Sequence, residues 1–421
     1  MSDVETTVCP QCGNAITVDS RHVVWCDECD WNLDAGSQPG SDSRRERRAA
    51  RAKDEGERLF LDLKQSAELR PGNSRARVAS LVLAFAVHLT TVAVVALGLY
   101  FVVTGFLTLV MFVFGIPLLL VGLVLRPQLG RLDRDALTLT PTDAPVLYEL
   151  LNRIGADLGA KPVDVIAIEP DFNAAHGQIG IRQQRVLWIG LSLWNILDDQ
   201  QRIGLLAHEL AHQVNGDLTY GLVVGTALRT LGSWMAILHA RTRPRALIGS
   251  VVESVERLGE LLASLAMRAL SSAVGGVFRL EWSLLFHSQQ RAEYYADWLA
   301  AEIASTDAMV GCLDSLHLER FCILAIRFAA QHEKPDIWAA EREFLADLSP
   351  KEWERQRRLD ARQGTSIDST HPPTNLRIEL LRQSPAQEAH ITMSPAESAA
   401  ISEELARSFS RLNNAILEMA G

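Results

Sequence analysis

The longest apolar stretch of the chain runs from Val78 to Leu125 and contains no Asp, Glu, Lys or Arg. As a single helix, its 48 residues would extend about 72 Å, against a bilayer hydrocarbon core of about 30 Å. A turn near Thr104 and Gly105 would leave roughly 26 and 20 residues on its two sides, and either length can span a membrane. The pattern therefore predicts a two-helix transmembrane hairpin over residues 78–125.

The charges on either side of this hairpin predict its orientation. Five arginines flank it and the loop inside it is uncharged, and cationic flanks favour the cytoplasmic side. We therefore expect a multi-pass protein of the cell membrane, with the lipid bilayer as a partner and both the N-terminus and the domain after the hairpin in the cytoplasm. The flanking residues are Arg75, Arg77, Arg126, Arg131 and Arg134.

Residues 126–421 alternate between helical and strand patterns and predict a mainly α domain with a small β-sheet, an α+β fold. Residues 137–159 are predicted to be helical, and "VDVIAIE" and "RVLWIGL" are predicted to be short strands. Residues 218–286 are long and apolar but carry Arg229, Arg268 and Arg279. Since an arginine at a membrane centre costs at least ~2.5 kcal/mol, we expect helices that pack on the domain or lie in the interface. Residues 334–364 predict a surface helical insert.

The N-terminus is rich in cysteine, because four of the six cysteines of the chain lie within the first 29 residues. Cys9, Cys12, Cys26 and Cys29 form two C-x-x-C pairs, and four thiolates at such spacing hold zinc in a closed, structural site. Two disulfides or a redox pair are the alternatives. We predict a zinc ribbon over residues 1–35, joined by a charged linker over 36–77, that docks a protein partner. The basic run in this linker predicts a solvated helical face, or less strongly a contact with anionic lipid.

The stretch "LLAHELAHQVNGD", from Leu205 to Asp217, carries the candidate chemistry. His208 and His212 are four residues apart and would lie on one face of a helix, so both rings can reach one zinc ion. Glu209 would reach a water on that metal, as a general base. The alternative is a buried helix with two hydrogen-bonded histidines. A catalytic site needs a third ligand, and Glu293 and Asp297 in "QQRAEYYADWLA" are candidates, although a solvated helix face would show the same two acids.

The order of these motifs resembles the HtpX-like and CAAX-prenyl-protease-like zinc metallopeptidases. The chain has "FNAAHG", "HELAH", "EYYAD" and "THPPTNLRIELL" in the family's order. The resemblance implies that His208, His212 and Glu293 bind catalytic zinc, that Glu209 is the base and that Asp297 orients a ligand histidine. It also implies that His371 and Arg377 steady the transition state and that an extended substrate pairs with the edge at Asn173 and Ala174.

The function expected from this resemblance is zinc-dependent peptide-bond hydrolysis at a membrane. Together with the cysteine pairs it predicts two zinc ions, one catalytic and one structural. The expected substrate is a peptide or a damaged or misassembled membrane protein. The alternative is a non-catalytic zinc adaptor, but a structural site has no use for Glu209. Nucleic acid is not an expected partner, because the net charge is −10 and the ribbon region carries Asp19, Asp27, Glu28, Asp30 and Asp34.

Overall fold

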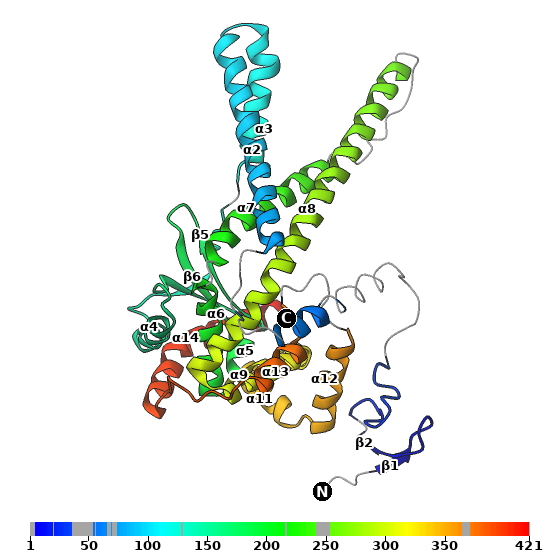
Figure 1. The fold of residues 1–421 in the computed structure, drawn as a ribbon, viewed down its shortest axis with the longest axis vertical. Coiled ribbons are helices and arrows are strands. Elements are labelled where there is room, and N and C mark those ends of the chain that lie inside the picture. Colours follow the sequence, from blue (N-terminus) through cyan, green and yellow to red (C-terminus); the bar gives the residue numbers. More distant parts are fainter. Residues whose placement is uncertain are drawn as a thin grey trace.

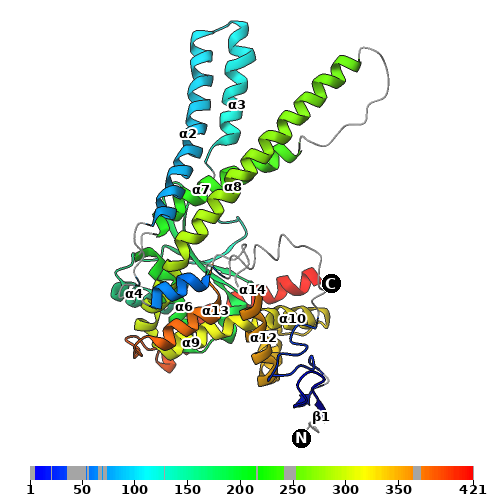
Figure 2. The same ribbon diagram turned by 45° about the vertical axis from the view of Figure 1, so that its right-hand side comes forward.

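The computed structural model describes residues 5–19, 21–35, 54, 56–64, 69, 74–127, 129–214, 217–240, 253–363 and 371–420. Most of these residues are helical, as the sequence predicts. A helical body carries two pairs of long helices that rise from one side and diverge, while the small N-terminal domain lies at the opposite end (Figures 1 and 2). Most of the predicted linker falls outside the described residues.

The first pair of helices is the predicted hairpin. Helix α2 (Arg75–Thr104) is preceded by Ser74, whose side chain caps the helix by accepting a hydrogen bond from the Arg77 amide. It packs against the π-helix η1 (Met111–Gly115) and α3 (Ile116–Leu125). A Cβ on Gly122 would meet Val95 at 2.5 Å, so glycine is what lets the two helices approach closely, as small residues do between helices in membranes.

The two limbs of this hairpin differ in length more than the sequence predicts. Helix α2 is long and apolar enough to cross a membrane, whereas Met111–Leu125 is a shorter apolar helix. At 1.5 Å per residue the second limb is about 22 Å long, less than the roughly 30 Å core. Residues 105–108 form the turn between the limbs, which includes Leu107 at a φ of 56°. That is why the second limb falls short of the expected 20 residues.

The second pair of long helices comprises α7 (Asp217–Ala240) and α8 (Glu253–Ala304). Both pack against the lower half of α2, in a cluster that includes Ala84, Val87, Tyr220, Val224 and Val274. The buried carboxyl of Glu281 on α8 accepts a 2.8 Å hydrogen bond from Ser80 of α2. The three arginines that argued against a membrane span lie on exposed faces of these helices: Arg229, Arg268 and Arg279.

A four-stranded sheet underlies the site, in the order β3-β4-β6-β5. Strands β4 (Val165–Glu169) and β6 (Gln184–Gly190) are parallel and match the two predicted strands. Strand β5 (Ala174–Ile179) pairs antiparallel with β6 at one edge of the sheet, with Ala174 opposite Ile189. The predicted edge strand is therefore an edge strand.

The helix predicted over residues 137–159 is wrong at its start. Residues Leu137–Leu139 form β3, which pairs antiparallel with β4, and α4 covers only Pro145–Leu158. "LTLT" alternates apolar and β-branched residues, a period that suits a strand. The Asp143 carboxylate then accepts from the Thr140 amide at 2.8 Å, which closes a turn before Pro145 begins the helix.

One apolar core joins the sheet to the helices on its inner face, and its largest fully buried members include Leu147, Ile154, Ile166 and Leu187. Its helical partners include α6 and the C-terminal half of α8. The remaining elements of the body are α5 (Leu191–Ile196), α6 (Asp199–Val214), α9 (Thr306–Ser315), η2 (Leu316–Leu318), α10 (Glu319–Gln331), α13 (Thr374–Gln383) and α14 (Pro395–Ala420).

The insert predicted over residues 334–364 contains α11 (Ile337–Ala346) and α12 (Pro350–Gln363). Its helical character is confirmed, but the prediction of a surface insert is wrong for part of it. Trp338 is 3% exposed and Glu341 is fully buried. Glu341 accepts hydrogen bonds from Ser192 at 2.5 Å and Asn195 at 2.8 Å, so α11 is tied to α5 inside the body.

Candidate metal centre and cleft

Helix α6 presents the two histidines of the HELAH motif. Its apolar residues Ile203, Leu206 and Leu210 enter the core. His208 and His212 lie one turn apart along the helix and direct their Nε2 atoms to within 3.4 Å of each other. His208 is 4% exposed, so the pair lies at the boundary between core and cleft.

Helix α8 brings Glu293 to these histidines from across the fold. Its carboxylate oxygens lie 3.5 Å from the Nε2 of His208 and 3.6 Å from the Nε2 of His212. Ligand atoms at about 2.0–2.2 Å from one tetrahedral zinc are about 3.3–3.6 Å apart. The three predicted ligands therefore form a triangle of the size that a single zinc ion requires.

Asp297, one turn after Glu293, contacts the far side of His208. Its Oδ1 lies 2.9 Å from the His208 Nδ1, and its two oxygens accept from the Arg377 guanidinium at 2.6 and 2.7 Å. Burial disfavours a charged Asp297, but the guanidinium outweighs burial and lowers the pKa of this carboxyl. Asp297 can therefore fix the ring orientation of His208 as an anion, and Arg377, 3% exposed, faces Asp297.

His371 approaches from the loop before α13. Its Nδ1 lies 2.5 Å from a Glu293 oxygen, and its side chain is 45% exposed. Potential ligand atoms of His208, Glu293 and His371 all lie within 4.8 Å of one another. His371 is thus beside the metal centre, close enough to contact a reacting group there.

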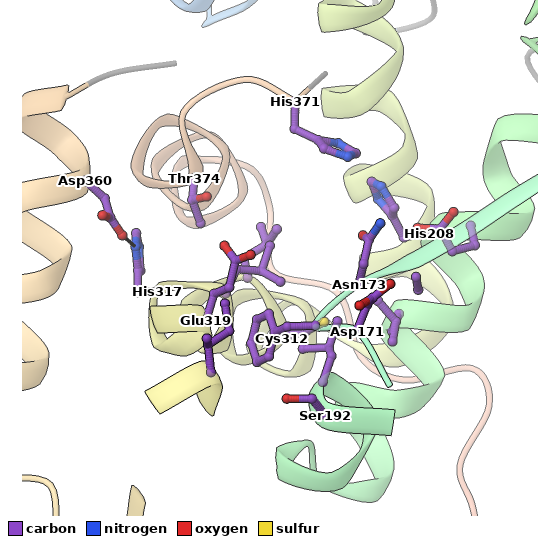
Figure 3. A pocket seen from close by; sticks show the side chains of 18 of the residues that line it. Asp171, Asn173, Ser192, His208, Cys312, His317, Glu319, Asp360, His371 and Thr374 are labelled. Atoms are coloured by element: carbon purple, nitrogen blue, oxygen red, sulfur yellow. Dashed lines mark hydrogen bonds and ion pairs between the residues drawn. The ribbon is translucent and has the colours of Figure 1, made fainter. Parts of the chain in front are cut away.

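The metal centre opens into a cleft of about 870 Å³. Glu209 lines this cleft, next to His208, and so do Asn173 and Ala174 at the beginning of the edge strand. Figure 3 shows His208 and His371 at one end of the cleft, with Asn173 close by. Apolar side chains form much of the floor: Leu193, Leu205, Met309, Cys312, Leu313 and Leu316.

The opposite end of the cleft holds a histidine that the sequence analysis did not single out. His317 is 5% exposed, and its Nδ1 lies 2.5 Å from Asp360 of α12. Figure 3 shows this pair beside Glu319, on the side of the cleft away from His371. His317 and Asp360 are 43 residues apart, and neither belongs to a spaced motif, so only the folded chain brings them together.

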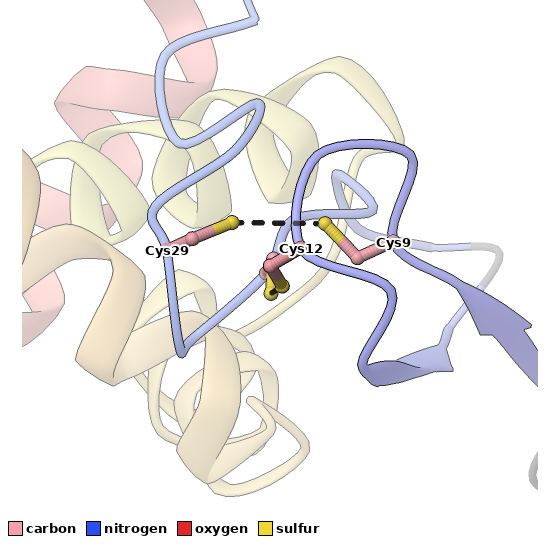
Figure 4. A group of neighbouring side chains, drawn as sticks. Cys9, Cys12 and Cys29 are labelled. Atoms are coloured by element: carbon pink, nitrogen blue, oxygen red, sulfur yellow. Dashed lines mark hydrogen bonds between the residues drawn. The ribbon is translucent and has the colours of Figure 1, made fainter.

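The four N-terminal cysteines also converge. The Sγ atoms of Cys9 and Cys29 are 3.6 Å apart (Figure 4). Those of Cys12 and Cys26 are 3.5 Å apart, and all four lie within 4.8 Å of one another. Thiolates at about 2.3 Å from a tetrahedral zinc are about 3.8 Å apart. The donor set and its size fit one structural zinc ion, framed by β1 (Glu5–Val8) and β2 (Ala15–Val18).

This cysteine domain docks on α12 of its own chain. Trp25 and Leu33 are each 1% exposed and pack with Leu359. Arg358 lies over the Trp25 ring at 5.3 Å and donates to Asp30 at 2.9 Å. The helix that carries Asp360 into the cleft therefore carries the N-terminal domain on another face.

Comparisons with known proteins follow the same motifs. The family model described as Peptidase family M48 matches residues 146–384. A Protease HtpX homolog of Bacillus licheniformis is 24% identical over 200 residues, which cover 48% of this chain and 56% of that protein. A Protease HtpX homolog of Syntrophobacter fumaroxidans is 25% identical over 247 residues, 58% of this chain and 78% of that protein.

A third relative, the Protease HtpX homolog of Desulforapulum autotrophicum, is 25% identical over 184 residues, which cover 43% of this chain and 56% of that protein. The chain therefore spans little more than half the length of the first relatives that it matches. No solved structure matches the chain significantly.

Proposed function

Because this chain belongs to peptidase family M48, we propose that it is a membrane-anchored zinc endopeptidase that cleaves peptides in the cleft beside His208. The observation that carries the proposal is the triangle of His208, His212 and Glu293, whose ligand atoms are separated by 3.4 to 3.6 Å. Zinc held there would polarise the carbonyl of the substrate and lower the pKa of a bound water to about 7.

Glu209 is the general base of the proposed reaction. It follows the first ligand on α6 and lines the cleft, so its carboxylate takes a proton from the attacking water and returns it to the leaving amine. A closed structural site needs no such carboxylate beside its ligands. Glu209 is therefore the residue that favours a peptidase over a non-catalytic adaptor.

His371 and Arg377 take different roles in this proposal. The half-exposed imidazole of His371 faces the cleft and stabilises the negative charge that develops on the substrate oxygen. Arg377 is buried and bonded bidentately to Asp297. We infer that Arg377 acts through Asp297, which holds the His208 ring, and that it is a positioning residue.

The substrate is proposed to bind as an added strand. Strand β5 lies at the edge of the sheet, and its first residue, Ala174, lines the cleft together with Asn173. An extended peptide can pair with such an edge through main-chain hydrogen bonds. Unfolded segments of damaged or misassembled membrane proteins offer extended chain, which suits a role in membrane-protein quality control.

The test is metal content and hydrolysis measured on the full chain purified in detergent. We expect two zinc ions per chain, and hydrolysis of an unstructured protein that a chelator abolishes and added zinc restores. His212→Ala should keep one zinc and lose hydrolysis, whereas Cys12→Ser should keep one zinc and retain hydrolysis at the catalytic centre. A fully zinc-loaded wild-type protein without hydrolytic activity would favour the adaptor.

A further inference from the structure

We propose that the turn between β5 and β6, residues 180–183, is a second membrane contact, which binds the surface of an anionic lipid bilayer. The inference rests on the membrane anchoring proposed above and adds to it a fixed position for the substrate-binding strand. Its occupant is the lipid surface itself, and Ile181 is the residue that enters it.

Ile181 is 89% exposed, more than any other exposed large hydrophobic residue in the described part of the chain. The turn that presents it is well defined. Gly180 has a φ of 67° and Gln183 a φ of 53°, and the Gln183 amide and side chain donate to the Gly180 carbonyl at 3.3 and 3.0 Å. An apolar side chain held outward at the end of a rigid hairpin suits insertion between lipid headgroups.

This turn is tied to the segment that leaves the membrane hairpin. The Gly180 amide donates to the Gly130 carbonyl at 3.0 Å. A Cβ on Gly130 would meet the Ile179 side chain at 3.1 Å, so the two segments are in close contact. Gly130 follows the end of α3 at Leu125 by only five residues. The turn therefore lies beside the point where the chain leaves the proposed membrane hairpin, and Figure 1 shows the β5–β6 hairpin rising on the side of the long helices.

The exposed surface of α2 places the bilayer at the same level. The Leu125 carbonyl accepts from Thr91 at 2.9 Å, so α3 ends beside the middle of α2. A helix needs about 20 residues to cross a membrane. If the crossing part of α2 starts at its last residue, Thr104, it extends back past Thr91 to about residue 85. An apolar stripe, 50 to 66% exposed, continues along this part of α2: Val78, Val82, Phe85, Leu89 and Val92. The lipid surface thus reaches the level of the α3 exit or below it.

The charges around the turn favour anionic headgroups. Four exposed arginines, Arg126, Arg131, Arg134 and Arg182, lie on the turn or on the segment that it contacts, against two exposed aspartates, Asp133 and Asp135. Basic residues at a membrane surface attract anionic lipids.

The other end of β5 lines the cleft, and a six-residue strand is about 20 Å long. The contact would therefore hold the cleft roughly one strand length from the lipid.

The proposal is tested by photocrosslinking in nanodiscs that contain phosphatidylcholine and phosphatidylglycerol in a 7:3 ratio. The full chain carries p-benzoylphenylalanine in place of Ile181, and lipid adducts are detected by intact mass. Leu97, exposed on α2, is the membrane control, and Val8, exposed on the N-terminal domain at the far end, is the solvent control. We expect an adduct yield at position 181 that exceeds the yield at position 8 at least tenfold and falls in pure phosphatidylcholine.

Lipid adducts at position 97 but not at position 181 would overturn the second contact and leave the anchor intact. Adducts at neither position would overturn both the anchor and this proposal. Adducts between position 181 and protein instead of lipid would also overturn it, because they would assign the turn to a protein partner.

Discussion

At the residue scale, two carboxylates one turn apart on α8 have different neighbours. Glu293 lies within 3.6 Å of the Nε2 atoms of His208 and His212. Asp297 instead contacts the Nδ1 atom of His208 and the Arg377 guanidinium. A carboxylate on the outer nitrogen of a ligand histidine fixes its tautomer and raises its affinity for metal. The two acids should therefore respond differently to substitution.

We predict that Glu293→Ala loses the catalytic zinc at neutral pH, whereas Asp297→Asn binds it about 10–100-fold more weakly. Asp297→Asn should recover hydrolysis in excess zinc, since its three ligands remain. Metal titration of both purified variants is the measurement, with Glu302→Ala, on the same helix outside the cleft, as the control that keeps two zinc ions. Loss of zinc in Asp297→Asn together with its retention in Glu293→Ala would show that the roles are reversed.

Substitutions of His371 and of Arg377 should also have different effects. His371→Ala should lower kcat by about 10²–10³-fold, the usual effect of removing one oxyanion donor, with zinc still bound. Arg377→Ala should instead reduce the free energy of unfolding by about 3–5 kcal/mol, because it leaves Asp297 buried without its partner. Thermal unfolding and steady-state kinetics of each variant measure the two effects. Loss of zinc in His371→Ala would make His371 a ligand. A stable Arg377→Ala variant with a low kcat would assign Arg377 a direct contact with the reacting group.

At the element scale, α12 joins the N-terminal domain to the cleft. Its Arg358 and Arg362 both donate to Asp30, while the neighbouring Arg357 donates to Asp314 of the body. The domain proposed to be a zinc ribbon therefore uses one of its faces within its own chain. A protein partner of the ribbon remains a proposal, and it would bind the other faces.

We predict that the double variant Arg358→Ala, Arg362→Ala weakens this docking by about 1–2 kcal/mol, a factor of about 5–30 in the docked population. The cause is the loss of two contacts to Asp30 and of the cation–π contact with Trp25. Hydrogen exchange of residues 21–33 should rise accordingly. Arg357→Ala is the matched control, since it removes a cation of the same helix without touching the ribbon. Equal exchange in the double variant and the control would contradict the docking.

Elements whose signals are local could be predicted from the sequence. The cysteine pairs, the HELAH helix and the apolar hairpin each depend on spacing within a few residues, and the structure brings each set together. The His317–Asp360 pair and the packing of Trp25 on Leu359 depend on contacts between distant segments, which no local spacing encodes. The start of α4 is mispredicted for a different reason: the two-residue period of "LTLT" covers only four residues, too few to stand out against the helical pattern that follows it.

At the scale of the whole molecule, the long helices rise from one side of the body and the N-terminal domain lies at the other (Figures 1 and 2). The ribbon is docked on α12 and the C-terminal α14 packs on the body. In the proposed membrane topology, the N-terminal domain and α14 therefore lie on the same side of the membrane as the cleft. The five arginines that flank the hairpin favour the cytoplasm for that side.

We predict that reporter fusions at Met1 and Gly421 both report a cytoplasmic location. The measurement is the activity of a paired reporter that is enzymatically active on only one side of the membrane. A fusion inside the hairpin loop, at Leu107, is the control and should report the opposite side. Fusions at the two termini that disagree would require an odd number of membrane crossings and would make part of residues 218–286 a span.

The proposed peptidase activity depends on Glu209, which would perform acid–base chemistry next to a zinc ion held by three other residues. Zinc content and peptide hydrolysis measured on the same purified sample of Glu209→Gln test it most directly, because the amide keeps the size of the side chain and removes its basicity. We predict two zinc ions per chain, as in the wild type, and hydrolysis reduced by about 10²–10⁴-fold. Hydrolysis near the wild-type rate in a zinc-loaded Glu209→Gln sample would contradict it.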